Sequence, residues 1–224
     1  MNRDPTDTLI TSLARDLQPV RPVRPLRGEV LRVGAVAGAV TVAVVAGLGL
    51  RPGLEVVPGQ TPFVAMALGL AVFGLGSIGA ALAFARPGLE DRGVALALGS
   101  VVSLLVCAGI AAFWLRAAAS TGDAVWRGER ELPCIVFSIL LALPAALCAT
   151  YLAASAAPIH SIRTSILTAA GATALGMVAA HLTCRTPGAW HTVLTHALAP
   201  MIGGFLLTAP LALMLRRRRF PAQS

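Results

Sequence analysis

The sequence predicts an all-α membrane protein, a six-helix transmembrane bundle with a short cytoplasmic N-terminal amphipathic helix. Its residues are 56% hydrophobic and its mean hydropathy is +0.78, well above the range of soluble domains. Only 12% of the residues are charged, and they cluster between long uncharged runs. Six of these runs reach the roughly 20 apolar residues that a helix needs to cross a bilayer.

Short connections join the six expected spans, so neighbouring helices should run antiparallel. A β-barrel would instead show short segments of alternating hydrophobicity. In the first span, Gly34 and Gly38 have the spacing that allows a neighbouring helix to approach closely, and the many glycines and alanines elsewhere allow the same. The expected spans are Leu31–Leu50, Phe63–Ala85, Val94–Leu115, Cys134–Ser155, Ser165–Thr183 and Thr192–Leu215. Residues 1–30 then form a cytoplasmic segment, 31–215 the transmembrane domain and 216–224 a cytoplasmic basic tail.

The N-terminal segment should begin with a helix over Asp4–Leu17. Asp4 to Asp7 supply capping side chains, a proline in the first turn and acidic charge. Leu9, Leu13 and Leu17 recur every four residues and form an apolar stripe, with Ile10 beside it. So short a helix is marginal alone in water. Its stripe therefore needs the bilayer surface, the rest of this protein or another protein.

A basic spacer follows this helix. The stretch Pro19–Pro25 has a proline at every third residue, so it should run extended and stiff.

The distribution of arginine predicts the orientation. All 18 basic residues are arginine; thirteen lie on the side of the N-terminal segment and five on the other. The positive-inside rule therefore predicts that both termini are cytoplasmic. Because these arginines sit beside hydrophobic segments, they indicate topology and contact with lipid headgroups, and we expect no direct binding of nucleic acid.

The interiors of the expected spans contain no Asp, Glu, Lys or Arg, although ion-coupled transporters usually need such groups there. A small-solute transporter or channel is the alternative interpretation of the chain. The sequence has no nucleophile motif, phosphate loop or HExxH, which indicates that the protein is not an enzyme. It also lacks CxxC, so a thiol oxidoreductase is poorly supported.

The four cysteines separate by depth. Cys107 and Cys148 lie inside spans and are most simply small buried hydrophobes. Cys134 opens the fourth span and Cys184 closes the fifth. Because those helices run in opposite directions, both cysteines should lie at similar depth on the non-cytoplasmic side. In a Gram-negative bacterium that side is oxidising, and paired thiols there can become a disulfide.

Three histidines add soft metal ligands near Cys184: His181, His191 and His196. Cys134 can complete such a ligand set. The alternative is that the histidines are interfacial residues and the thiols are merely packed.

Four features together resemble the NrsF-type membrane anti-sigma factors of proteobacteria. They are the segment Leu9–Arg21, the six spans, Trp126 followed by Cys134–Pro144, and His181–Cys184 with His196 twelve residues after Cys184. The chain departs from the family pattern at Arg185-Thr186, where Pro-Glu is usual, and at Thr195, where Trp is usual.

The resemblance implies a multi-pass protein of the bacterial inner membrane that holds an extracytoplasmic-function sigma factor until stress releases it. Cys134 and Cys184 match the periplasmic cysteine pair of the family and would sense oxidation or a heavy-metal ion. No cofactor is required beyond such a transient ion. The residues expected to bind the sigma factor are Leu9, Ile10, Leu13, Leu17, Pro19, Val20 and Arg21.

Overall fold

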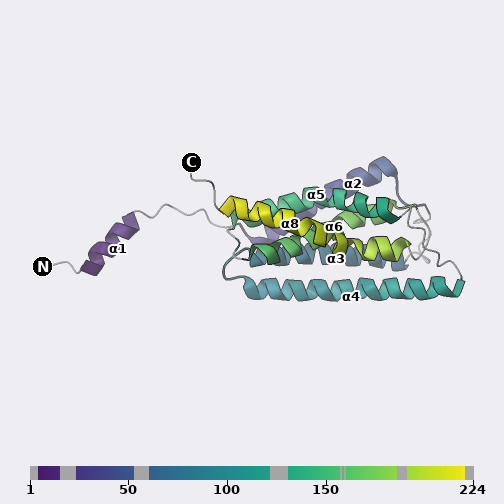
Figure 1. The fold of residues 1–224 in the computed structure, drawn as a ribbon, viewed down its shortest axis with the longest axis horizontal. Helices are drawn as coiled ribbons and strands as arrows, with labels where there is room; N and C mark the ends of the chain where they lie inside the picture. Colours follow the sequence, from purple (N-terminus) through teal and green to yellow (C-terminus); the bar gives the residue numbers. More distant parts are fainter. Residues whose placement is uncertain are drawn as a thin grey trace.

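The computed structural model describes residues 5–15, 24–52, 61–121, 131–156, 158, 160–185 and 191–219. Every regular element among these residues is helical, which confirms the all-α fold (Figure 1). The elements are α1 (Pro5–Arg15), α2 (Leu26–Leu48), α3 (Thr61–Phe84), α4 (Glu90–Thr121), α5 (Glu131–Ser155), α6 (Ser161–Thr183), the π-helix η2 (Thr192–Ala197) and α8 (Ala199–Arg219).

Six of the described helices are long and apolar enough to cross a membrane, so the chain is a multi-pass membrane protein. Their order agrees with the prediction from hydropathy. The first begins at Leu26 rather than Leu31, because Pro25 directly precedes the helix with φ −61° and ψ 135° and starts it there. The third of these helices, α4, is also longer than the expected span Val94–Leu115, since it runs from Glu90 to Thr121.

Helix α6 lies at the centre of the bundle and packs against α2, α3, α5 and α8. A Cβ on Gly171 would lie 2.7 Å from the Gly74 carbonyl oxygen in α3, and one on Gly176 would lie 2.4 Å from the Ser138 carbonyl oxygen in α5. Only glycine fits at such approaches between backbones. In α2, a Cβ on Gly34 would lie 3.4 Å from the Leu75 side chain of α3, whereas Gly38 faces open space, so the close approach expected at this pair is wrong at Gly38.

The antiparallel helices give the bundle two ends. We name the end that holds Leu26, Arg86 and Arg217 the arm end, because α2 meets the N-terminal segment there. The opposite end, which holds Phe63 and Cys184, is the thiol end. The last turn of α8, the final described helix, lies at the arm end in Figure 1.

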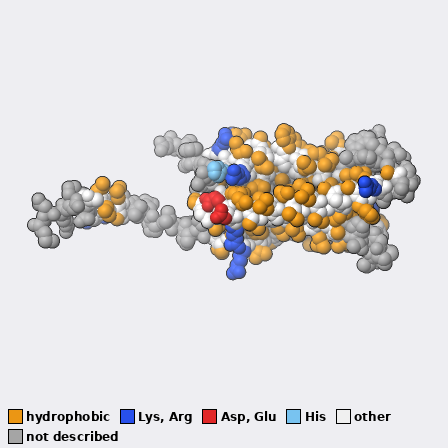
Figure 2. All heavy atoms as spheres, turned by 90° about the horizontal axis from the view of Figure 1, so that it is seen from below, with side chains coloured by type: hydrophobic (Ala, Val, Ile, Leu, Met, Phe, Trp, Pro, Cys, Tyr) orange, Lys and Arg blue, Asp and Glu red, His pale blue; other side chains and the backbone are white. Residues whose placement is uncertain are grey.

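Between the two ends the surface of the bundle is hydrophobic. Figure 2 shows hydrophobic side chains along the middle of one face and arginines near both ends. Leu68, Leu98, Leu105 and Phe205 are among the large apolar side chains that are mostly exposed. Soluble monomers rarely expose so extended an apolar surface, whereas a bilayer solvates it.

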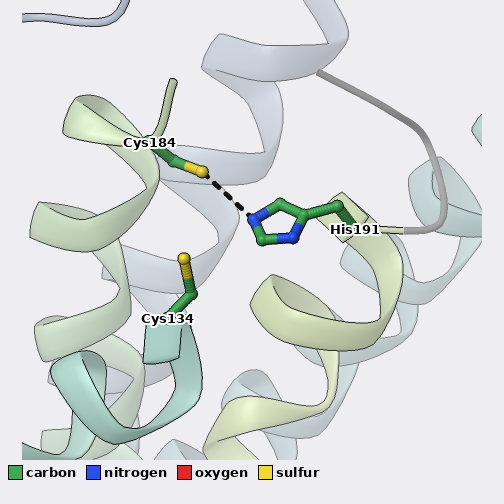
Figure 3. Close-up of side chains that lie close together, drawn as sticks. All are labelled: Cys134, Cys184 and His191. Atoms are coloured by element: carbon green, nitrogen blue, oxygen red, sulfur yellow. Dashed lines mark hydrogen bonds between the residues drawn. The ribbon is translucent and has the colours of Figure 1, made fainter. Parts of the chain in front are cut away.

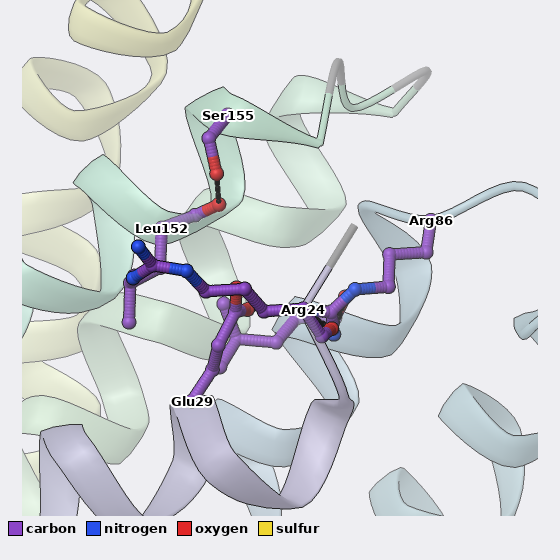
Figure 4. Close-up of polar contacts among 6 residues, drawn as sticks. Arg24, Glu29, Arg86, Leu152 and Ser155 are labelled. Carbon is purple, nitrogen blue, oxygen red and sulfur yellow. Dashed lines mark hydrogen bonds and ion pairs between the residues drawn. The ribbon is translucent and has the colours of Figure 1, made fainter. Parts of the chain in front are cut away.

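The arm end contains a buried ion pair that the sequence analysis missed. Glu29 of α2 and Arg86, just after α3, are 2% and 5% exposed and form a salt bridge (Figure 4). Arg86 also donates hydrogen bonds to the carbonyl oxygens of Leu82, at 3.2 Å, and Arg24, at 3.3 Å. Glu29 lies in the first turn of α2, outside the expected span Leu31–Leu50, and Arg86 balances its charge.

Candidate functional site

The side chains of Cys134, Cys184 and His191 meet at the thiol end, where they point toward one another (Figure 3). Their ligand atoms all lie within 4.8 Å of one another, and Cys184 Sγ is 3.1 Å from His191 Nε2. Cys184 and His191 are buried, and Cys134 is half-buried. Two thiols and an imidazole at this separation can bind a soft metal ion, and the two thiols can react with an oxidant.

The antiparallel course of α5 and α6 produces this cluster. Cys134 lies in the first turn of α5, and Cys184 follows the last residue of α6 with an extended backbone, φ −66° and ψ 119°. The end of α6 is tied to the end of α2: Arg51 N–H donates to the Leu182 carbonyl oxygen at 2.9 Å, and Arg185 Nη2 donates to the Leu48 carbonyl oxygen at 2.8 Å. These bonds hold the position of Cys184 relative to the bundle.

A second pair of imidazoles lies beside the cluster. His181 and His196 are both fully buried, and their Nδ1 atoms are 2.5 Å apart. His181 stacks on the ring of Phe63, and its Nε2 is 3.1 Å from the Phe63 carbonyl oxygen. The His196 ring packs edge-on against His191, with 5.4 Å between the ring centroids. All three histidines named from the sequence therefore lie together at the thiol end.

The surroundings of Cys184 favour its thiolate. A hydrogen bond from the Cys134 side chain lowers the pKa of the Cys184 thiol below its ordinary value; burial raises it, and a hydrogen bond with His191 lowers it again. The thiolate is the form of cysteine that reacts with electrophiles and binds metals. This site is therefore suited to thiol chemistry.

The other two cysteines lie away from the cluster. Cys107 is 1% exposed and packs against Gly69, where an added Cβ would meet its sulfur. Cys148 is in the interior of α5 and packs at the edge of the apolar core. Both positions agree with their interpretation as small hydrophobes.

The expected sigma-binding residues are only partly described. Leu9, Ile10 and Leu13 lie on α1 with 58%, 59% and 60% of their surface exposed. The other expected binding residues, Leu17, Pro19, Val20 and Arg21, lie outside the described residues.

Two features were not predicted from the sequence: the contact of the Phe63 carbonyl oxygen with His181 beside the cluster, and the ion pair at the arm end. Phe63 carried no signal, because it contributes a backbone oxygen that every residue has. Glu29 offered a weak signal, as a carboxylate at the edge of a span, but its partner Arg86 is 57 residues away in the chain.

The described residues thus form a six-span membrane bundle with a thiol and imidazole cluster at one end, preceded by a short helix with exposed leucines. Residues 13–217 match the model of the family NrsF, described as negative regulator of sigma F. The chain belongs to this family and is a negative regulator of a sigma factor, as the resemblance indicated. No similar curated protein and no similar solved structure was found.

Proposed function

We propose that this protein holds an extracytoplasmic-function sigma factor at the bacterial inner membrane and releases it when Cys134 and Cys184 react with an oxidant or a heavy-metal ion in the periplasm. It acts as a regulator and not as an enzyme. One observation carries the sensing part of the proposal: two thiols from different helices lie with His191 within 4.8 Å, at the opposite end of the bundle from the N-terminal segment.

The N-terminal helix is the part that binds the sigma factor. The stripe of α1 is exposed at Leu9, Ile10 and Leu13, and an amphipathic helix with unburied leucines fits an apolar groove of a partner protein. The neighbouring residues Leu17, Pro19, Val20 and Arg21 extend the contact in this proposal. Burial of the stripe in the sigma factor would give the short helix the partner that it needs.

Helix α6 connects sensing with release in this proposal. It ends beside Cys184 and packs against α2, which carries the N-terminal segment. At the arm end, Arg86 joins Glu29 and the Arg24 carbonyl oxygen, so the start of α2 is fixed to the turn after α3. A shift of α6 on reaction of the thiols would move α2 and, through it, the segment that binds the sigma factor.

The orientation gives a first prediction. Thirteen of the 18 arginines lie on the side of the N-terminal segment, so a reporter fused at Ser224 should be active only if it is a cytoplasmic reporter. Paired cytoplasmic and periplasmic reporter fusions measure this directly. Activity of the periplasmic reporter at Ser224 would contradict the orientation and, with it, the periplasmic position of the cysteines.

The thiol pair gives a second prediction. Cys134→Ser or Cys184→Ser should abolish the response of the sigma factor to an oxidant or cadmium, because a hydroxyl neither forms a disulfide nor binds soft metals well. A sigma-dependent reporter measures the response, and immunoblotting checks that the protein is made.

Cys148→Ser is the matched control, since Cys148 lies on the same helix as Cys134 at a distance of about 21 Å along its axis. This variant should respond as the wild type does. If the variants at Cys134 and Cys184 also respond normally, these two thiols are structural and the sensing proposal is wrong.

A further inference from the structure

The hydrogen bonds of His181 determine which of its nitrogens carries the proton. The Phe63 carbonyl oxygen can only accept, so His181 Nε2 is the donor in their 3.1 Å contact. Both His181 and His196 are fully buried, and a buried imidazole is cheapest in its neutral form. In neutral His181, Nδ1 is then an acceptor.

This arrangement sets the tautomer of His196. Its Nδ1 lies 2.5 Å from His181 Nδ1 and must donate the proton, because His181 can only accept there. The other nitrogen of neutral His196, Nε2, is therefore a bare lone pair. It is fully buried and has no hydrogen-bond partner of good geometry among the described residues.

His196 lies directly beside the thiol and imidazole cluster. The His196 ring packs against His191, with 5.4 Å between the ring centroids, and its Nδ1 is already engaged by His181. A buried acceptor without a full partner is costly unless the site serves a ligand. Metal-binding histidines commonly present one nitrogen to the ion and donate from the other, as His196 is set to do.

The π-helix η2 brings the two histidines to the same side. In an α-helix, residues five positions apart, as His191 and His196 are, point about 140° away from each other. The wider turn of η2, Thr192–Ala197, reduces this angle, and the ring centroids of the two histidines lie 5.4 Å apart. Such single π turns occur frequently at functional sites.

We propose that His196 is the fourth ligand of a site for a thiophilic divalent cation, completed by Cys134, Cys184 and His191, and that His181 is its positioning residue. Two thiolates and two neutral imidazoles balance the charge of a divalent ion, which a buried site requires. Binding displaces the thiol protons to solvent. This inference rests on the proposed function and names the residues that bind the metal ion in its sensing step.

Ligand atoms of a tetrahedral zinc site lie about 3.3–3.8 Å apart. Three of the proposed ligand atoms are already within 4.8 Å of one another, so binding draws the starts of α5 and η2 toward the end of α6 by about an ångström. This is a small closing motion of three connected segments.

The test uses the full chain, purified in detergent under reducing conditions and without a sigma factor. Cd²⁺ binding is followed by the ultraviolet thiolate-to-metal charge-transfer band, and Co²⁺ binding by its visible spectrum, which reports coordination number and ligand type. We expect one ion per chain and a four-coordinate Co²⁺ spectrum. His196→Ala should weaken Cd²⁺ binding at least about 10–100-fold and change the Co²⁺ spectrum.

Two variants of His181 separate positioning from packing. His181→Gln keeps a donor for the Phe63 carbonyl oxygen and an acceptor for His196, so binding should stay near that of the wild type. His181→Phe keeps a ring to stack on Phe63 but removes the acceptor, and should weaken binding about 10–100-fold. His160→Ala, at the exposed arm end, is the control and should bind as the wild type does.

Wild-type affinity and an unchanged Co²⁺ spectrum in His196→Ala would overturn the four-ligand site. Equal affinities of the two His181 variants would overturn the positioning role. Thermal unfolding of each variant without metal identifies any general loss of folding. Because no sigma factor is present, this test is independent of the release experiment. Ion binding by wild-type protein together with failed release would reject the proposed function and retain the metal site. Release of the sigma factor without ion binding by the purified protein would reject the metal site and retain the proposed function.

Discussion

Replacing Leu13 by Glu is expected to abolish capture of the sigma factor, while the membrane bundle still forms. Leu13 is in the middle of the exposed stripe of α1, between Leu9 and the expected contact at Leu17. In the proposed complex its side chain is buried in a groove, and a carboxylate buried there without a partner costs several kcal/mol. At about 1.4 kcal/mol for each factor of ten, the affinity should fall by at least a hundredfold. Co-purification of the sigma factor from membranes measures the loss.

Thr11→Glu is the matched control for this variant. Thr11 lies on the same helix but about 160° around it from Leu13, so the same added charge stays in water. We expect this variant to capture the sigma factor as the wild type does. Full capture by Leu13→Glu would show that the stripe is not the binding surface, and equal loss in both variants would indicate a response to charge alone.

Removing the arginine of the buried ion pair should destabilise the bundle strongly. Arg86→Met leaves Glu29 buried without its counter-charge and also removes the hydrogen bond to the Arg24 carbonyl oxygen. Breaking one half of a buried pair typically costs about 3–5 kcal/mol. Thermal unfolding in detergent should therefore show a large decrease in Tm.

The double variant Glu29→Gln with Arg86→Met should recover most of this stability, because no unpaired charge is left inside. A double-mutant cycle in the free energy of unfolding measures the coupling between the two positions. Arg92→Met, an exposed arginine at the same end, is the control and should unfold like the wild type. Additive losses at Glu29 and Arg86 would mean that the pair does not act as a unit.

Patterns along the chain predicted the spans and the approximate meeting of the cysteines. Span number follows from hydropathy, because lipid requires long apolar helices. Once Cys134 opens one span and Cys184 closes the next, antiparallel packing alone places them at one end. The amphipathic helix α1 was equally predictable from the sequence, since the spacing of its leucines is a local property.

Features that depend on packing were not predictable in this way. The local spacing of Gly34 and Gly38 did not show that Gly38 faces open space, nor that the closest approaches between backbones are at Gly171 and Gly176 of the central helix. His196 joins the cluster because a π turn changes its direction, and η2 contains no residue type that signals such a turn. These outcomes depend on how whole helices fit together.

The burial of α6 also bears on how the protein is made. Its mean hydropathy of 1.5 is the lowest among the six spans, the others lying between 1.9 and 2.4. Threonines and His181 account for much of this difference, and in the finished bundle neighbouring helices cover them. The polar side chains of such a segment are less favourable in contact with lipid than when they are packed against α3 and α5. We therefore expect α6 to enter the membrane during synthesis alongside helices already inserted, and to depend on them for its retention there.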